Sequence, residues 1–445
     1  MRMTWSLFRS TAVGALGGLL FGFDTAVISG TTGQLRSTFH LSPEALGWTV
    51  SAALWGTVAG CALAGPTGQR AGSRNMLRWA AVLYILSSLG CAFAPNWSIL
   101  VASRFIGGLG IGASSVLGPV YIAEIAPSRW RGRLVGAFQV NIVLGILAAY
   151  ISNWFIAGLG LGATEWRWQF GVALLPALVF FLVLFTIPQT SRFLVSRNSL
   201  EEALCVIRAM GSDAPEAEMA EIGASLATEH SEAMEPLFVR RLRLPIFLAI
   251  TIGLFNQLSG INAVLYYAND IFAAAGLSRM SAFSQSIFIG LSNLVATFIA
   301  MSLIDKIGRK TLLLIGSVGT CASLLGTAYF FMTGSHQNTI VWLLVLFIGF
   351  FALSQGAVIW VFISEIFPNA VRSQGSSLGS FTHWIMAAII AWTFPIFVNG
   401  VPNGGYYAFI FFSCMMVLSL IFIWKVMPET KGRTLEQIQK DLGIL

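Results

Sequence analysis

Charged residues are scarce in this sequence. They make up 10% of its 445 residues, whereas soluble domains carry about 25%. So few charges cannot cover a water-facing surface of normal size, which argues against a soluble enzyme and against a disordered chain. Histidine is also rare, with four residues, and the five cysteines show no paired spacing. The sequence therefore predicts no disulfide, no metal site and no cofactor. It contains no Ser-His-Asp or paired-carboxylate pattern either, so we expect no enzymatic activity.

Hydrophobic residues are abundant instead. They account for 56% of the chain, and 45 glycines and 34 phenylalanines suit closely packed helices in lipid. Apolar runs long enough to span a bilayer as helices follow one another, without the alternation that β-barrel strands require. The runs lie at about 7–30, 46–65, 75–94, 98–125, 133–157, 167–187, 244–270, 283–304, 311–332, 340–366, 374–398 and 405–426. We predict an all-α membrane protein with twelve transmembrane helices.

The basic residues indicate the orientation of these spans. If the N-terminus lies inside, all but four of the 26 lysines and arginines fall on inner segments. The exceptions are Arg36, Arg167 and Arg279 on outer segments and Arg104 within a span. Such a bias predicts that both termini are cytoplasmic. The net charge of +7 is then explained by topology, and we expect no nucleic-acid partner. Because the first run contains Asp24 and lacks a clear cleavage site, we interpret it as a span and not as a signal peptide.

An internal repeat divides the chain into two halves. Residues 124–131 and 365–372 both read E-I-x-P-x-x-x-R, and the basic loops 69–74 and 305–310 stand at nearly the same offset. Parallel halves of this type place a substrate site at the midplane between them. We predict an N-terminal six-helix bundle at 1–188, a cytoplasmic helical linker at 189–243, a C-terminal six-helix bundle at 244–427 and a cytoplasmic tail at 428–445. The linker is either a passive connection or a brace for the inner gate.

Two ionisable residues lie deep within the predicted spans: Asp24 in the first and Arg104 in the fourth. An ionisable group at mid-helix costs about 2.5–3.5 kcal/mol, so each such residue is informative. Burial favours the protonated form of a carboxyl group, whereas a nearby arginine favours the charged form. Movement of Arg104 away from Asp24 would therefore promote proton uptake. The pair is either a proton-coupling device or a static ion pair that holds two helices together.

The seventh apolar run has a polar face. Asn256, Ser259, Asn262 and Tyr266 lie on one side of a helix by their spacing, and Gln257 stands beside them. Amides both donate and accept hydrogen bonds, which suits a ligand with many hydroxyls. The alternative is hydrogen bonding between helices, at about 0.6 kcal/mol each. Polar or aromatic candidates in other runs are Gln139, Asn141, Asn293, Trp360, His383 and Trp384. An aromatic face beside amides suits a sugar ring.

Three glycines in the first run are four residues apart. Gly14, Gly18 and Gly22 have the small-x-x-x-small spacing that lets helix backbones approach closely in lipid. We expect this face of the first helix to pack tightly against a neighbour.

Four stretches of the sequence resemble the sugar porter family of the major facilitator superfamily. They are Gly17–Asp24, Pro119–Glu124, Gln257–Asn262 and Pro428–Thr434. The resemblance covers nearly the whole chain, and residues 21–30 and 364–372 are most similar to bacterial xylose–proton and glucose–proton symporters. It implies the major facilitator fold, in which two helical bundles rock about a central sugar by alternating access.

The resemblance also implies roles for individual residues. The residues that it places around the sugar are Phe21, Gln139, Asn256, Gln257, Asn262, Tyr266, Asn293, Gly356, Trp360 and His383. It gives Asp24 the proton and makes Arg104 its partner. The inner charge clusters that it implies, which lock the outward-facing state, consist of Arg70, Glu124, Arg131, Asp305, Arg309, Glu365 and Arg372.

The sequence departs from the family pattern at several positions. Gln69 and Gln189 stand where acidic residues are usual, and Asn256 stands where a glutamine is usual. The tenth run reads Gln355-Gly356-Ala357 where a proline is frequent, and His383 replaces an amide. These departures concern the identity of the sugar and the strength of the inner lock, not the fold.

We therefore expect a proton-coupled symporter of a monosaccharide, either a hexose or a pentose. Its partners are the sugar, the proton and the lipid bilayer. We place it in the inner membrane of a bacterium, as a multi-pass protein that functions as a monomer. Two alternatives stay open. One is a facilitative sugar uniporter in which Asp24 and Arg104 form a structural pair. The other is a membrane sugar receptor, which long terminal tails would favour.

Overall fold

The computed structural model describes residues 3–127, 129–231, 236–334, 337–368, 371–433 and 435–444. Four positions of the sequence motifs lie outside these ranges: Ser128, Asn369, Ala370 and Thr434. Every regular element within the described ranges is a helix. The predicted all-α class is confirmed.

Eleven helices in the described residues are long and apolar enough to cross a membrane. One more helix of spanning length is α3, Ser73–Ala92, with 20 residues. Twenty residues of α-helix measure about 30 Å, the thickness of a bilayer's hydrocarbon core. The first two turns of α3 carry Arg74 and Arg78, which lower its hydropathy relative to the other spans. The predicted set of twelve transmembrane helices is therefore confirmed.

The helices group into two compact units. The first comprises residues 1–27, 52–152 and 164–233, and the second comprises residues 28–51, 153–163 and 234–445. Residues 28–51 form the connected ends of the first and second spans, and residues 153–163 follow from the C-terminal end of the fifth. Both segments thus cluster with the C-terminal half of the chain. The predicted division of the chain at residues 188, 243 and 427 stays a prediction.

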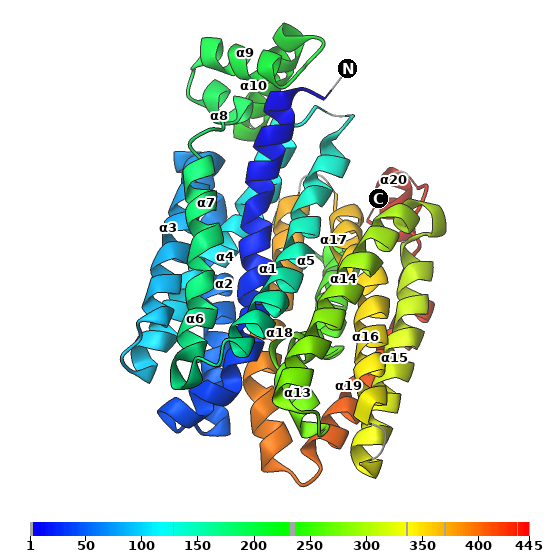
Figure 1. Ribbon diagram of the computed structural model, residues 1–445. Coiled ribbons are helices and arrows are strands. Elements are labelled where there is room, and N and C mark those ends of the chain that lie inside the picture. The colour runs from blue at the N-terminus through cyan, green and yellow to red at the C-terminus, as the bar shows by residue number, and fades with distance from the viewer. Residues whose placement is uncertain are drawn as a thin grey trace. The chain divides into compact units, whose positions relative to one another are not determined.

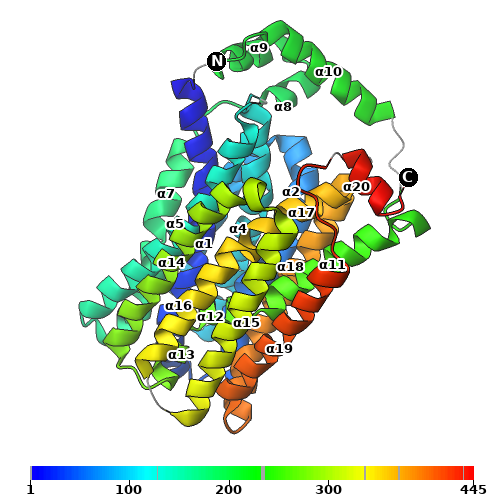
Figure 2. The same cartoon turned by 90° about the vertical axis from the view of Figure 1, so that its right-hand side faces the viewer.

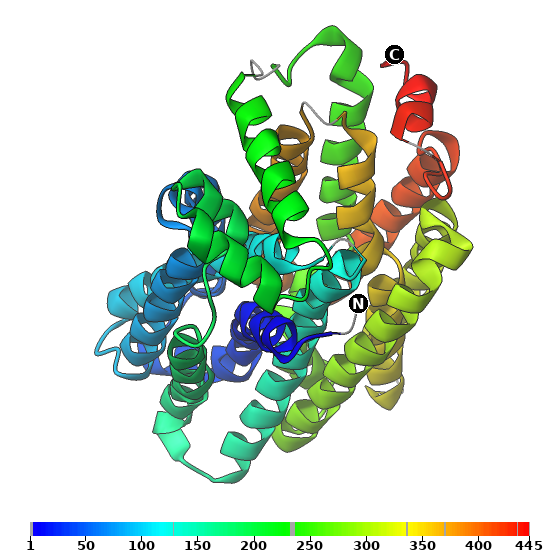
Figure 3. The same ribbon diagram turned by 90° about the horizontal axis from the view of Figure 1, so that it is seen from above.

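The first unit is built on long helices that run alongside one another (Figure 1). Besides α3, its helices, some shared with the second unit, are α1 (Trp5–Phe39), α2 (Pro43–Ala71), α4 (Trp97–Ile125), α5 (Arg131–Gly158), α6 (Glu165–Val172), α7 (Leu174–Val183), α8 (Ser191–Ser196), α9 (Leu200–Ala209) and α10 (Pro215–Ser231). Viewed from above, α1 is seen nearly end-on, whereas α10 lies in the plane of the page (Figure 3). The last three helices therefore lie across the end of this bundle.

The glycine face of α1 makes the close contacts that its spacing predicts. A Cβ atom at Gly22 would lie 1.8 Å from the carbonyl oxygen of Ile142 in α5, and one at Gly18 would lie 2.5 Å from that of Phe138. Gly14 faces Tyr121 in α4. Only glycine allows backbones to approach this closely.

The short helices α8 to α10 are tied to the bundle of the first unit. The Thr4 hydroxyl donates to the carbonyl oxygen of Ala209 over 2.9 Å, and the Arg197 guanidinium donates to the carbonyl oxygen of Arg70. Arg208 pairs with Glu216 at 2.6 Å on the exposed side. The predicted helical insert is confirmed, and its function as linker or brace stays open.

The second unit contains the remaining helices. They are α11 (Arg243–Leu258), α12 (Ile261–Tyr266), α13 (Ala268–Ala274), α14 (Arg279–Ile307), α15 (Arg309–Thr333), α16 (Gln337–Leu353), α17 (Gln355–Ile366), α18 (Arg372–Gly400), α19 (Gly404–Lys425) and α20 (Leu435–Asp441). Two single 3-10 turns also occur: η1 (Gly162–Thr164), which crosses from the second unit into the first, and η2 (Arg240–Leu242), which lies in the second unit. Helix α15 packs against both α16 and α19, as Figure 2 shows from the side.

Two spans of the second unit are broken in mid-course. The break between α11 and α12 falls at Gly260, whose φ of 83° is left-handed and whose missing side chain makes room for Phe412. The break between α16 and α17 falls at Ser354, whose hydroxyl donates to the carbonyl oxygen of Phe350 over 2.7 Å. Gly316 of α15 lies directly against that hydroxyl. Broken helices in a membrane are tolerated where side chains satisfy the freed backbone groups.

Candidate functional site

Asp24 of α1 and Arg104 of α4 face each other within the first unit. The Nη1 atom of Arg104 donates to the Oδ1 atom of Asp24 over 3.4 Å. Strong charge-assisted hydrogen bonds measure about 2.7–2.9 Å, so this pair is loosely engaged. The Arg104 side chain is fully buried, whereas 21% of the Asp24 side chain is exposed. The carboxylate of Asp24 is therefore partly accessible, whereas its cationic partner is shut off from the surface.

Helix α6 contributes an aromatic ring to the surroundings of Arg104 and also contains a buried polar pair. Its guanidinium lies over the ring of Phe170 in α6, 5.6 Å from the centroid. One position earlier in α6, Gln169 is completely buried and donates to the carboxylate of Glu165 over 3.2 Å. Sequence reasoning missed this buried acid, since Glu165 precedes the predicted apolar run at 167–187 and does not lie deep inside it. The apolar run that follows Glu165 directly is the sequence feature that indicates its burial at the start of a span.

An amide cluster lies at the break between α11 and α12 in the second unit. The Nε2 atom of Gln257 donates to Oδ1 of Asn256 over 3.0 Å, and the Nδ2 atom of Asn262 donates to Oε1 of Gln257 over 2.7 Å. Gln257 also lies 3.2 Å from the imidazole nitrogens of His383 in α18. The structure thus brings four of the predicted sugar-binding residues into one hydrogen-bonded group.

Two aromatic rings border this amide cluster. The ring centroids of Trp360 in α17 and His383 lie 4.9 Å apart. Trp360 is 37% exposed, while the amides behind it are less than 10% exposed. An open aromatic face beside buried donors and acceptors suits the apolar face and polar edge of a sugar ring.

The other predicted sugar-binding residues are distributed over both units. Asn293 of α14 and Tyr266 of α12 are buried in the second unit, at 8% and 3% exposure, and Gly356 is partly exposed in α17. Phe21 and Gln139 belong to the first unit, in α1 and α5, and both are partly exposed. The contribution of these five residues to sugar binding stays a prediction.

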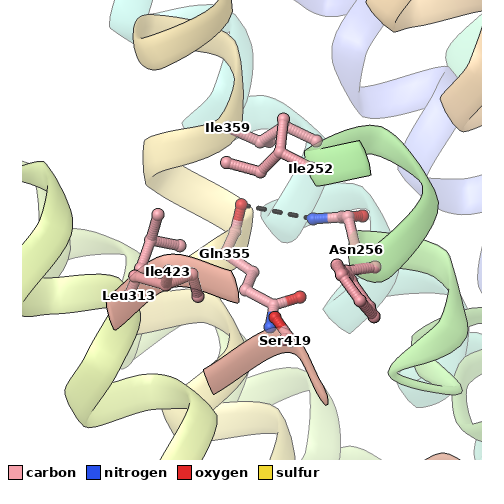
Figure 4. A pocket seen from close by; sticks show the side chains of 8 residues that line it. Ile252, Asn256, Leu313, Gln355, Ile359, Ser419 and Ile423 are labelled. Carbon is pink, nitrogen blue, oxygen red and sulfur yellow. Dashed lines mark hydrogen bonds between the residues drawn. The ribbon is translucent and has the colours of Figure 1, made fainter. Parts of the chain in front are cut away.

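A small cavity adjoins the amide cluster inside the second unit (Figure 4). Its lining consists of Ile252, Phe255, Asn256, Leu313, Gln355, Ile359, Ser419 and Ile423. The Nδ2 atom of Asn256 donates to the backbone carbonyl oxygen of Gln355 over 3.3 Å at the start of α17. Sequence reasoning named Gln355 only as a departure from the family pattern. Its link to Asn256 depends on the helix break, which no periodicity reveals.

The predicted charge cluster of the second unit is assembled. Arg309 at the start of α15 pairs with Asp305 at 3.0 Å and with Glu365 at 2.9 Å. The hydroxyl of Thr430 donates to the other oxygen of Glu365 over 2.6 Å. Arg372 begins α18, and its Nε and Nη2 atoms have no hydrogen-bond partner among the described residues.

The corresponding residues of the first unit lie at three helix ends. Arg70 is at the end of α2, Glu124 is at the end of α4, and Arg131 begins α5. Arg70 and Arg131 are exposed, and Glu124 is partly buried. Their function as a lock stays a prediction.

Glu429 holds the beginning of α15 in the second unit. Its carboxylate accepts hydrogen bonds from the backbone N–H groups of Arg309 and Lys310, each over 3.0 Å. An anion at a helix N-terminus is stabilised by the free N–H groups and the helix dipole. In the first unit the side chain of Gln189 contacts Gly72, before the start of α3. The Gln189 substitution therefore removes a charge from the equivalent position of the repeat.

At its opposite end, the second unit contains a network that sequence reasoning missed. Asn269 of α13 donates to the carbonyl oxygen of Ser29 in α1 over 3.1 Å. Asp270 of α13 lies beside Thr32 and Arg36 of α1. The rings of Trp48 in α2 and Trp392 in α18 stack 5.2 Å apart. The C-terminal end of α1 thus contacts α13, and the N-terminal end of α2 contacts α18.

Known proteins are similar to this chain in sequence and in structure. Residues 10–442 match the family model described as "Sugar (and other) transporter". The D-xylose-proton symporter of Escherichia coli K12 is 37% identical over 472 residues, which cover 97% of this chain and 95% of that protein. The arabinose-proton symporter of Bacillus subtilis is 36% identical over 445 residues, which cover 98% and 95%.

A solved structure gives the same result. The inward open conformation of the xylose transporter XylE from E. coli matches with a TM-score of 0.87 at 35% identity, over 98% of this chain and 99% of that one. The predicted major facilitator fold is confirmed. The sequence match, the helical architecture and the structural match agree that this chain belongs to the family of sugar (and other) transporters, the sugar porters of the major facilitator superfamily.

Proposed function

We propose that this protein is a proton-coupled monosaccharide symporter that works by alternating access. The observation that carries the proposal is the loose pair of Asp24 and Arg104, with Asp24 partly exposed and Arg104 fully buried. A transporter that only equilibrates sugar has no need of a titratable carboxylate in a span, where it costs about 2.5–3.5 kcal/mol. The printed names of two relatives, a D-xylose-proton and an arabinose-proton symporter, support the same function.

The sugar is a hexose or a pentose that binds at the amide cluster. Asn256, Gln257 and Asn262 offer donors and acceptors to its hydroxyls, and Trp360 offers an apolar face to its ring. The remaining predicted contacts, Phe21 among them, complete the site. Cluster amides now bonded to one another would exchange those bonds for bonds to the sugar.

Coupling follows from the charge of Asp24. When Asp24 binds a proton, its attraction for Arg104 is lost and the helices that carry the two residues are free to separate. An inside-negative membrane potential then drives the bound charge inward, at about 2.3 kcal/mol per charge per 100 mV. A ligand shifts a conformational equilibrium only by its differential affinity for the two states. Sugar and proton would each supply part of that difference.

The charge clusters would control which side opens. We propose that the pairs of Arg309 with Asp305 and Glu365 lock the inner side in the outward-facing state, together with Arg70, Glu124, Arg131 and Arg372. The network of Asn269 and Asp270 with α1 would close the outer side in the opposite state.

The surroundings of the protein follow from the positive-inside bias and from its relatives. We propose a bacterial inner membrane, with both termini in the cytoplasm and lipid around the spans. The functional unit is a monomer.

Uptake of radiolabelled D-xylose, L-arabinose or D-glucose into proteoliposomes tests the proposal. Sugar should accumulate against its gradient when the outside is acidic, and a protonophore should abolish the accumulation. Asp24→Asn should abolish accumulation yet retain sugar exchange, because exchange needs no net proton movement. Asp24→Glu, which preserves the carboxyl group, should retain part of the accumulation.

The alternatives make opposite predictions in this assay. A uniporter with a structural ion pair would equilibrate sugar without regard to pH, and Asp24→Asn would leave its net uptake intact. A receptor would bind sugar and transport none.

A further inference from the structure

The C-terminal end of α1 is held against α13 by uncharged groups, within the second unit. The Nδ2 atom of Asn269 donates to the carbonyl oxygen of Ser29 in α1 over 3.1 Å. The Oδ1 atom of the same amide accepts a hydrogen bond from the hydroxyl of Ser286 in α14 over 2.8 Å. Both ends of the Asn269 amide therefore have partners, and this contact needs no charged side chain.

An acidic residue nevertheless stands at the same contact. Asp270 follows Asn269, and its carboxyl group lies beside Thr32 and Arg36 of α1. The Oδ2 atom of Asp270 is buried and has no hydrogen-bond partner among the described residues. A carboxylate oxygen that is shut off from water without a partner is costly while it carries charge. Asp270 is therefore poorly solvated as an anion where α1 covers it.

Arg36 is the charged residue that opposes this effect. It acts on the carboxyl group of Asp270 through its charge and not through a hydrogen bond. Its side chain is exposed, so water and salt screen the attraction. Burial prevails over Thr32 and Arg36 together and raises the pKa of Asp270 to about 6.

The other elements near α13 bring no further charge to this carboxyl group, as far as the described residues show. The tyrosines that precede α13, Tyr266 and Tyr267, are neutral below about pH 10. On α14, which packs against α13, the charged residue at this end is Arg279, whose guanidinium lies over the ring of Phe283. His40, just beyond α1, is exposed and is not among the groups that act on Asp270.

We propose that Asp270 is a second proton-binding site, which is filled when the end of α1 closes over α13 and emptied to the same side when it opens. In the open state water reaches the carboxyl group, which ionises as an ordinary aspartate does. In the closed state α1 covers the group, which then binds a proton. Because this proton returns to the side from which it came, it regulates closure and is not carried across the membrane.

Acid on the outer side should therefore favour the closed state, an inference that rests on the proposed function and its orientation. The closed-to-open ratio depends on how many protons each state binds. With a pKa of about 6 in the closed state and the ordinary value in the open state, the ratio should rise about ten-fold between pH 7 and pH 5. Above pH 7 it should be nearly constant.

Distances between spin labels across this end test the second site. The measurement uses the purified full-length Asp24→Asn protein, because this substitution removes the coupling carboxyl group, with the five native cysteines replaced by alanine. Labels are placed at Thr38 of α1 and Met280 of α14, which are both exposed. Pulsed electron paramagnetic resonance should show that the closed-to-open ratio rises about ten-fold from pH 7 to pH 5.

Substitutions at the contact should alter this response in different ways. Asp270→Asn, which is neutral at every pH, should abolish it and hold the protein near the closed fraction that the parent reaches at pH 5. Asp270→Glu should retain it. Arg36→Gln removes the opposing charge and should move the midpoint to higher pH. Glu44→Gln and His40→Asn are the matched controls, since both residues are exposed at this end, and they should leave the response unchanged.

Three results would overturn the second proton-binding site. One is a pH response that survives in the Asp270→Asn protein. Another is a midpoint that Arg36→Gln does not move. The third is a response that disappears in the His40→Asn protein, which would assign the proton to the histidine, a residue that titrates in the same range.

The transport assay separates this site from the proposed function. If Asp24→Asn abolishes sugar accumulation while the label distances do not change with pH, the second site is wrong and the proposed symport stands. If Asp24→Asn leaves accumulation intact, the proposed symport fails. The distances in the Asp270→Asn protein then still decide whether closure binds a proton.

Discussion

Asp270 is an acidic residue with a buried carboxyl group, and it lies outside the membrane-spanning segments. It lies on α13, beyond the spanning segment that ends at Tyr266, and it contacts Thr32 and Arg36 near the end of α1. Burial raises the pKa of its carboxyl group to about 6, against the opposing effects of the Thr32 hydrogen bond and the Arg36 charge. Arg36 is the charged group that faces Asp270 from the helix packed against it. The folded protein therefore binds a proton here that the unfolded chain releases.

Replacement of Asp270 by asparagine should change how stability depends on pH. Because the folded pKa lies above the ordinary value, Asp270 contributes most at low pH, and this contribution is lost as the pH rises through about 6. Near pH 7 the Asp270→Asn protein should be more stable by about 1–3 kcal/mol, since one pKa unit corresponds to about 1.4 kcal/mol. Near pH 4 the two proteins should converge. Thermal unfolding across this range measures the difference, and a constant difference would contradict the assignment.

The sequence identified Asp24, Arg104 and the amides of the seventh span for one physical reason. Polar side chains are so costly in lipid that each one must have a partner or a function. The sequence did not reveal Gln355, Asp270 or Glu429 as parts of a site. Their importance depends on partners that a helix break or a distant loop brings close, and periodicity within one span contains no such information.

Helix α1 shows what decides packing at the scale of an element. Its glycines at positions 18 and 22 lie against carbonyl oxygens of α5, whereas Gly33 of the same helix has no atom within 4 Å of an added Cβ. The spacing of the glycines predicts the contact face correctly. The breaks at Gly260 and Ser354 could not be predicted, because the hydropathy of a span is the same whether its helix is straight or interrupted.

Gly22→Ala and Gly33→Ala should have effects of opposite sign. The first places a methyl group 1.8 Å from the oxygen of Ile142, so α1 and α5 must separate, at a cost of about 1–3 kcal/mol or more. The second meets open space and should stabilise the helix by up to about 1 kcal/mol. Unfolding temperatures of the two purified variants measure the contrast. Equal effects would show that α1 and α5 are not in close contact.

The start of α15 offers a second test at this scale. Glu429→Ala removes the acceptor for the N–H groups of Arg309 and Lys310 and should lower stability by about 1–2 kcal/mol. Glu216→Ala is the control, because its pair with Arg208 is exposed and should contribute little. A Glu429 variant as stable as the control variant would show that the helix start needs no anion.

For the molecule as a whole, lipid makes the fold class readable from sequence. Backbone groups in a bilayer must be satisfied within each span, so long apolar runs become helices, and the basic loops show which ends share a side. The sequence did not reveal that residues 28–51 and 153–163 cluster with the C-terminal half. That grouping depends on contacts between segments far apart in the chain, such as Asn269 with Ser29, and hydropathy and charge contain no such information.

If this end of the molecule opens and closes during transport, as we propose, the N-terminal end of α2 must leave and rejoin α18, which gives the last prediction. At Gly47 of α2, an added Cβ would lie 2.1 Å from the carbonyl oxygen of Trp392. Gly47→Leu should therefore prevent closure at this end and hold the site open to the outside. Sugar binding to the purified variant should persist, whereas proteoliposome uptake should fall more than about ten-fold, because the closed state would be disfavoured by more than about 1.4 kcal/mol. Gly33→Leu, which meets open space, controls for added bulk. Because Gly47→Leu blocks only the conformational change, uptake at the wild-type rate would mean that transport proceeds without this closure.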